Sequence, residues 1–74
     1  MAGKSKKYLA RFDGQTFTRV TDRTYSHVVI GRNAGKDWYP TAWVGREDLV
    51  EAACRRARKI FSEVRAIPVE ERYR

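Results

Sequence analysis

The sequence has almost none of the residues that cross-link a small protein. It contains one cysteine, Cys54, and one histidine, His27. An intramolecular disulfide is therefore excluded, and the two side chains do not complete a four-ligand zinc site. A chain of 74 residues forms one domain and buries only about 60% of the surface that its unfolded form exposes. We expect stability to come from the apolar core alone, or from that core together with self-association as a homodimer.

Long hydrophobic runs are also missing. No apolar stretch approaches the roughly 18 residues that a membrane-spanning helix needs. Residues 1–7 are basic, like the start of a signal peptide, but no apolar stretch follows them. The lone thiol suits a reducing compartment. We therefore expect a cytoplasmic protein that does not associate with membranes.

A recognisable catalytic set is absent as well. His27 follows Ser26 directly, and adjacent side chains of a strand point to opposite faces, so we do not expect this pair to form a nucleophile and its base. The loop 31–36 contains two glycines and two cations, but it lacks the spacing and the hydroxyl residue of a phosphate-binding P-loop. Cys54 is expected to be a small buried hydrophobe rather than a reactive thiol. We expect no enzymatic activity, no cofactor and no metal.

What the sequence has in excess is positive charge. Sixteen Lys and Arg against nine Asp and Glu give a net charge of +7. A field of this sign favours anionic partners, which include nucleic acid, an acidic protein face and an anionic membrane surface. The alternative is that the charge serves solubility alone.

A hairpin is predicted near the N-terminus. Residues 8–12 and 15–20 are β-prone and flank Asp13-Gly14. This dipeptide is the strongest short-range hairpin signal, because a type I′ turn needs positive φ at both central positions. The two-residue turn places the apolar and aromatic side chains on one face, namely Tyr8, Ala10, Phe12 and Phe17. The other face is mostly polar and carries Arg11 beside Thr16 and Thr18.

Two more strands are expected after this hairpin. Residues 25–30 are the most strand-like segment and predict the central strand. Residues 38–44 predict a third strand, in which Pro40 indicates an edge position or a bulge, since proline cannot donate to a ladder. We expect Trp43 to face the core and Trp38 to face outward.

A single long helix is predicted from Arg46 to about Ala66. Its apolar residues recur at spacings of three and four: Val50, Ala53, Cys54, Ala57, Ile60, Phe61 and Val64. Two acids favour a helix start at 47–48, and Ile67-Pro68 is expected to end the helix, because a residue before proline avoids the α region.

The predicted fold class is therefore α+β: a three-stranded antiparallel sheet with one long C-terminal helix packed on one face, in the order β-β-β-α. The opposite face of the sheet is expected to stay open. This domain covers residues 8–67, between a disordered basic arm at 1–7 and a short charged tail at 68–74.

The candidate nucleic-acid-binding residues are the cations of the arm and the sheet: Lys4, Lys6, Lys7, Arg11, Arg19, Arg23, Arg32 and Lys36. The cations expected on the polar face of the helix are interpreted as an ordinary solvated surface, because Glu51 and Glu63 interrupt them. Trp38 and Tyr39 are candidate aromatic anchors that stack on a base, fill a pocket of a partner or seal a homodimer.

The order of three strands and a packed helix resembles the DNA-binding domains of plant ethylene-response factors and the arm-binding domains of phage integrases. Residues 43–45 (Trp-Val-Gly) and 49–53 (Leu-Val-Glu-Ala-Ala) are similar to the strand-to-helix junction of the plant domains. In that family, arginines and tryptophans of the sheet contact the major groove. The resemblance implies such contacts for Arg11, Arg19 and Arg32, although the arginine- and glycine-rich opening of the family is missing here.

A second resemblance is to small proteins encoded by actinobacterial phages, a group with no assigned activity. It rests on residues 23–29 (Arg-Thr-Tyr-Ser-His-Val-Val), on Trp43 and on residues 45–50 (Gly-Arg-Glu-Asp-Leu-Val). These segments span about half the chain. The resemblance implies expression inside a bacterial host and interference with a host system.

Two functions follow from these observations. The first is a non-enzymatic, phage-type module that binds nucleic acid, DNA rather than RNA, through the cations of its sheet and arm. The second is an inhibitor or modulator of a host protein, in which Trp38 and Tyr39 anchor an acidic host partner and the charge steers encounter.

Overall fold

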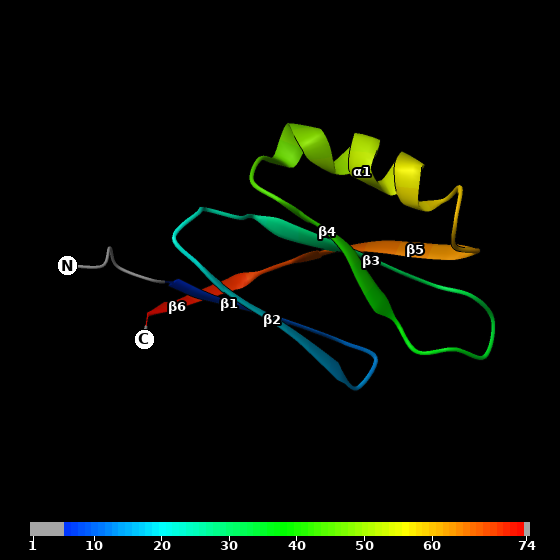
Figure 1. The fold of residues 1–74 in the computed structure, drawn as a ribbon, viewed down its shortest axis with the longest axis horizontal. Helices are drawn as coiled ribbons and strands as arrows, with labels where there is room; N and C mark the ends of the chain where they lie inside the picture. Colours follow the sequence, from blue (N-terminus) through cyan, green and yellow to red (C-terminus); the bar gives the residue numbers. More distant parts are fainter. Residues whose placement is uncertain (1–5, 74) are drawn as a thin grey trace.

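Two three-stranded antiparallel sheets and one short helix make up residues 6–73, the part of the chain that the computed structural model describes (Figure 1). The strands are β1 (Lys6–Phe12), β2 (Gln15–Thr21), β3 (His27–Arg32), β4 (Tyr39–Val44), β5 (Glu63–Pro68) and β6 (Glu70–Tyr73). A 3-10 turn at Glu47–Leu49 leads into α1 (Val50–Ala57). We call the β2-β1-β6 sheet the outer sheet and the β4-β3-β5 sheet the inner sheet.

The hairpin of β1 and β2 confirms the prediction from Asp13-Gly14. Both turn residues have positive φ, 53° and 77°, as a type I′ turn requires. The register pairs Phe12 with Gln15 and Ala10 with Phe17. Strand β1 begins at Lys6, so Lys6 and Lys7 belong to the sheet rather than to an arm. The expected arm at 1–5, with Lys4, lies outside the described residues.

The predicted long helix is wrong, and with it the β-β-β-α fold class. Strand β5 replaces the second half of that helix and pairs with β3 from His27 to Arg32. Within β5, Val64 and Ala66 pack toward α1, while Ile67 packs toward the outer sheet. This alternation is the period of a strand. The segment forms a strand because doing so satisfies the second hydrogen-bonding edge of β3.

The last residues form β6, where a charged tail was expected. Residues 70–73 pair antiparallel with Lys6–Leu9 and complete the outer sheet. The chain passes from β5 to β6 through Val69, whose N–H donates to the Ser26 carbonyl at 3.0 Å. The likeness to three-strand-plus-helix DNA-binding domains depended on the expected element order, so it carries no argument for this fold.

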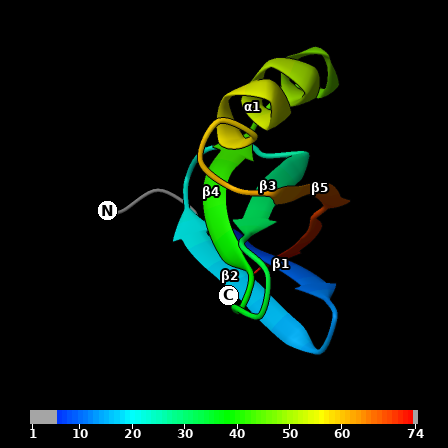
Figure 2. The same cartoon turned by 90° about the vertical axis from the view of Figure 1, so that its right-hand side faces the viewer.

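The three layers are the outer sheet, the inner sheet and α1, as Figure 2 shows. Strand β3 is the central strand of the inner sheet, which confirms the prediction for this segment. Val28 and Ile30 pack against the outer sheet, whereas Val29 packs against α1. All three are fully buried. Both faces of the inner sheet are thus covered, and within residues 6–73 only the outer sheet keeps an open face.

Trp38 faces the core, contrary to expectation, whereas Trp43 packs against the core as expected. Trp38 is buried between the sheets, with 5% of its surface exposed, and its ring lies 5.2 Å from that of Phe12. Trp43 is half-buried at the border of the same core. The register of β4 shifts opposite the Val29–Ile30 step of β3, so the phase of alternation is not continuous along this segment. Strand β4 is also an edge strand, which confirms both indications drawn from Pro40.

Candidate nucleic-acid interface

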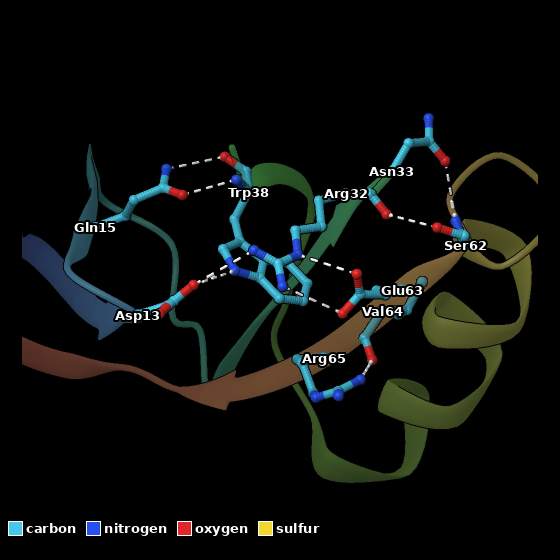
Figure 3. A network of polar contacts seen from close by, with 9 residues as sticks. All are labelled: Asp13, Gln15, Arg32, Asn33, Trp38, Ser62, Glu63, Val64 and Arg65. Atoms are coloured by element: carbon cyan, nitrogen blue, oxygen red, sulfur yellow. Dashed lines mark hydrogen bonds and ion pairs between the residues drawn. The ribbon is translucent and has the colours of Figure 1, made fainter. Parts of the chain in front are cut away.

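Arg32 is held in a polar network that joins the two sheets (Figure 3). Its guanidinium donates to the Glu63 carboxylate at 3.2 and 3.4 Å and to Asp13 at 3.4 Å. It also lies 4.5 Å from the centroid of the Trp38 ring. The Trp38 indole N–H donates to the same Asp13 carboxylate at 3.3 Å. These contacts engage Arg32, whose side chain is 30% exposed, and they hold Trp38 inside the protein, so Trp38 does not face outward as the sequence suggested.

Gln15 completes this network from β2. Its side-chain oxygen accepts the Trp38 backbone N–H at 2.7 Å, and its amide nitrogen donates to the Trp38 carbonyl at 3.1 Å. Because Trp38 precedes β4 and Gln15 opens β2, the two bonds tie a loop of the inner sheet to the outer sheet. The network therefore has a structural role.

Three of the other candidate cations lie around the connection between β2 and β3. Lys6 donates to the Thr24 hydroxyl at 3.1 Å, and Arg19 lies 5.6 Å from the Tyr25 ring centroid. Arg23 is exposed, and its carbonyl accepts the Tyr8 hydroxyl at 3.0 Å. Lys36 is exposed in the separate loop between β3 and β4. The seven predicted cations that lie within residues 6–73 therefore do not form one surface.

A smaller set of cations lies on the open face of the outer sheet. Alternation along β1 directs Lys7, Leu9 and Arg11 away from the inner sheet, because Tyr8 and Ala10 are buried on the other side. The register adds Thr16, Thr18 and Val20 from β2, together with Glu70 and Arg72 from β6. Lys7, Arg11 and Arg72 are all exposed. We call these eight residues the outer face.

Arg11 lies between two hollows of this face. One hollow, of about 430 Å³, is lined by Leu9, Ala10, Arg11, Ile67, Pro68, Glu70 and Arg72. It forms at the end of the pairing between β1 and β6, where Leu9 pairs with Glu70. The chain that precedes Glu70 belongs to β5 and to the inner sheet. The second hollow, of about 420 Å³, is lined by residues 11–16 of the hairpin. The guanidinium groups of Arg11 and Arg72 thus flank a hollow with apolar side chains in its lining.

The charge of the outer face is positive. Arg72 donates to Glu70 at 3.1 Å, which pairs the single acid of this set. Lys7 and Arg11 remain without an ion pair among those of residues 6–73. Asp13 and Glu63, the two acids of the network around Arg32, are paired with Arg32.

Arg72 is the functional candidate that the sequence did not reveal. Residues 69–73 contain Val and Tyr among charged residues, and this run is too short and too polar to indicate a strand by pattern. Its pairing with β1 gives Arg72 a fixed place opposite Lys7. Only the register of the outer sheet identifies it.

The adjacent Ser26 and His27 side chains do meet, contrary to expectation. The His27 Nδ1 lies 2.9 Å from the Ser26 hydroxyl, because Ser26 precedes β3 and is not bound by its alternation. The same hydroxyl lies within 3.3 Å of the Val44 carbonyl. No acid among the described side chains hydrogen-bonds His27. Cys54 is buried, as predicted.

Within residues 6–73, no group of three or more His, Cys, Asp or Glu residues is arranged to hold a metal ion. Over the same residues, no helix has the length and apolar character needed to cross a membrane. The chain matches no protein-family model, no curated protein and no solved structure. Its function is therefore inferred from its own residues.

Proposed function

We propose that this protein is a small, non-enzymatic nucleic-acid-binding module that contacts DNA through its outer face. The observation that carries the proposal is the position of Arg11, exposed between two hollows on an open sheet. Lys7 lies on the same face of β1, and Arg72 lies opposite Lys7 on β6. Three cations on one regular surface are able to contact the same phosphate backbone, which cations scattered over the molecule are not.

The outer face also offers groups for the rest of the nucleotide. The hydroxyls of Thr16 and Thr18 are exposed beside Arg11 and Leu9, their partners on β1. Hydroxyl side chains hydrogen-bond phosphate or base edges. Leu9, Ile67 and Pro68 line the hollow between the two arginines, and such side chains pack against a sugar or a base. Phosphates would contact the guanidinium groups at its rim.

The proposal places the protein in the cytoplasm, where nucleic acid is accessible. The resemblance of residues 23–29 and 45–50 to proteins of actinobacterial phages supports a bacterial host cell as that compartment. The basic segment before β1, which includes Lys4, adds to the electrostatic attraction because it precedes Lys6 and Lys7 in the chain.

A second function, binding and modulation of a host protein, is supported by one observation. Tyr39 is 63% exposed, and an exposed aromatic ring is a frequent anchor of protein interfaces. Trp38 does not share this role, because it is buried between the sheets. In this alternative the positive charge steers encounter with an acidic partner.

The test of DNA binding is fluorescence anisotropy with labelled duplex DNA, single-stranded DNA and duplex RNA, each over a range of salt concentrations. We expect Arg11→Ala to weaken DNA binding about tenfold, which corresponds to the loss of one hydrogen-bonded charge. The slope of log K against log salt should fall by about 0.9, one phosphate contact.

The matched control is Arg56→Ala, which removes the same charge from an exposed position on α1. It should leave both the affinity and the salt slope close to those of the unmodified protein. Equal losses from the two variants would mean that only the net charge matters, and the outer face would then not be the binding site. Tighter binding of RNA than of DNA would contradict the choice of DNA.

A further inference from the structure

A groove runs between α1 and the free edge of β4, on the side of the inner sheet that does not face the outer sheet. One hollow of this groove, of about 200 Å³, is lined by residues 42–45 of the strand side and by Leu49, Ala52, Ala53 and Arg56. The next, of about 140 Å³, shares Ala42, Ala53 and Arg56 and extends to Ile60. Because the two hollows share lining residues, they form one continuous groove beside the strand.

The strand along this groove has an edge that is unpaired among the strands of residues 6–73. Strand β4 pairs with β3 on one side only, since it ends the order β4-β3-β5. An edge strand presents a row of backbone N–H and C=O groups that accept another extended chain. Pro40 and the register shift interrupt the first half of β4, whereas residues 42–44 pair with β3 without interruption. The available edge is therefore the half that lines the larger hollow.

Exposed hydrophobic side chains gather at the same groove. Among residues 6–73, four large hydrophobic side chains are exposed, and three of them are Tyr39, Leu49 and Ile60. Leu49 lines the first hollow and Ile60 the second. Tyr39 opens β4, with its ring 6.4 Å from Phe61. An apolar strip next to a free strand edge is the surface that strand addition uses.

One cation of α1, Arg56, lines both hollows of the groove, and further cations lie near it in the chain. Residues 52–62 contain no acid and four cations, Arg55, Arg56, Arg58 and Lys59. All four are exposed, and only Arg55 has an ion-pair partner among the described residues, Glu51 at 3.5 Å. At the far end, Arg46 hydrogen-bonds Asp48 at 2.8 and 3.1 Å and thereby lowers the pKa of that carboxyl group. The net charge of residues 52–62, which include Arg56 of the groove, is thus positive.

We propose that this groove binds an extended acidic segment of a partner protein, which adds to β4 as a further strand of the inner sheet. Alternate side chains of the segment face α1. Small apolar side chains among them fill the two hollows, and carboxylates lie against Arg56 and its neighbours. This site is separate from the outer face, so the proposal does not depend on DNA binding.

A second copy of this chain fits the groove less well. Pairing β4 with β4 of a copy about a twofold axis places the same surface of both molecules together. The two α1 helices would then meet across the pair, each with its four cations at positions 55–59. Like charges brought together disfavour the contact. An acidic segment meets the same cations with attraction instead.

The probe for the test is a labelled peptide of repeated Glu-Thr-Val-Thr units, which directs Glu and Val to one face of a strand. The control peptide has Lys in place of Glu. We expect the acidic peptide to bind at physiological salt and the lysine peptide to bind at least about tenfold more weakly. On binding, hydrogen exchange of the backbone amides of residues 42–44 should slow, because strand addition protects the edge that faces solvent.

Two variants separate this site from the outer face. Arg56→Ala should weaken binding of the acidic peptide and leave DNA binding unchanged, whereas Arg11→Ala should do the reverse. Both positions are exposed, and equal melting temperatures will verify that both variants fold. Equal binding of the two peptides, or no slowing of exchange in residues 42–44, would overturn the proposal. Slowed exchange there without peptide, at concentrations where the protein dimerises, would assign the edge to a second copy and also overturn it.

Discussion

At the scale of single residues, Arg32 shows that a cation predicted from the sequence to bind nucleic acid can also form ion pairs and pack against the core of the protein. Its two ion pairs, to Asp13 and Glu63, involve side chains that are 30–59% exposed, so each contributes at most about 1 kcal/mol to stability. Burial of the Trp38 ring beneath it contributes more, about 3 kcal/mol by analogy with other large-to-small substitutions. Arg32 thus covers a core residue, Trp38, and contributes to stability through this contact.

Gly31 is a residue at which packing leaves no room for a side chain. A Cβ added there would lie 2.6 Å from Cδ2 of the Phe61 ring, far inside van der Waals contact. We expect Gly31→Ala to lower the free energy of unfolding by about 1–3 kcal/mol, the usual effect of overpacking. Urea denaturation followed by tryptophan fluorescence measures this change.

The control for this prediction is the same substitution in a Phe61→Ala background. Removal of the ring removes the clash, so Gly31→Ala should then have a smaller effect, and the double-mutant cycle should give a favourable coupling. An undiminished effect in the Phe61→Ala background would mean that the backbone of β3, rather than the ring, excludes a side chain at this position.

At the scale of elements, the segment after α1 is the clearest case in which the helical spacing of apolar residues competes with strand pairing. Ile60, Phe61 and Val64 continue the helical spacing of Val50, Ala53, Cys54 and Ala57, which is why a longer helix was predicted. The structure ends α1 at Ala57 and leaves Ile60 71% exposed. Strand β5 forms because the long-range pairing with β3 outweighs the local preference for helix.

Strand β6 gives a direct test of the outer sheet. Deletion of residues 70–74 removes all pairing between β6 and β1, together with the contact of the Tyr8 hydroxyl with Glu71 at 3.4 Å. We expect a loss of stability on the order of 2 kcal/mol and a lower urea midpoint. DNA binding should also weaken, because Arg72 is lost.

A disordered tail predicts the opposite result for this deletion. Its removal would leave the urea midpoint unchanged, because no backbone hydrogen bonds would be lost. Restoration of the midpoint by Arg72→Ala in the full chain, with DNA binding still reduced, would separate the role of β6 in folding from the role of Arg72 in binding.

At the scale of the whole molecule, the net charge of +7 opposes folding through self-repulsion. The five ion pairs of the described residues lie at partly or fully exposed positions, where each is worth little. Screening by salt should therefore remove more destabilising repulsion than stabilising attraction. We expect the melting temperature to rise between low and physiological ionic strength, as the screening length falls from about 30 Å to about 8 Å.

Differential scanning calorimetry at several concentrations of a weakly binding salt such as sodium chloride checks this expectation. A melting temperature that falls as salt increases would mean that the ion pairs, including those of Arg32, contribute more than their exposure suggests. The same series in phosphate would report anion binding in addition to screening, through a further rise in melting temperature.

The two proposed sites also differ at this scale. The outer face belongs to the sheet formed by β2, β1 and β6, whereas the groove is lined by residues of β4 and α1. Helix α1 lies on the side of the inner sheet that faces away from the outer sheet (Figure 2). Val28, Ile30 and the other core residues between the sheets separate them. A single small domain thus has one positively charged surface on each side of its central sheet.

The sequence by itself determined the features that depend on neighbouring residues. Asp13-Gly14 set the hairpin and its register, because only a few residues tolerate positive φ in a two-residue turn. The strand character of residues 27–30, the edge position indicated by Pro40 and the burial of Cys54 were also predictable. Each follows from local backbone chemistry or from a short apolar pattern.

Only the tertiary structure decided the features that depend on distant partners. The strand β5 exists because β3 offers an edge, and β6 exists because β1 offers another. The burial of Trp38 follows from its contacts with Gln15, Asp13 and Arg32. The surroundings of the cations were decided in the same way: Arg32 is paired with Glu63 from β5, while Arg11, which has no ion pair within residues 6–73, lines the same hollow as Arg72 from β6. Long-range pairing joins residues whose local sequences carry no record of one another, so no local pattern predicts it.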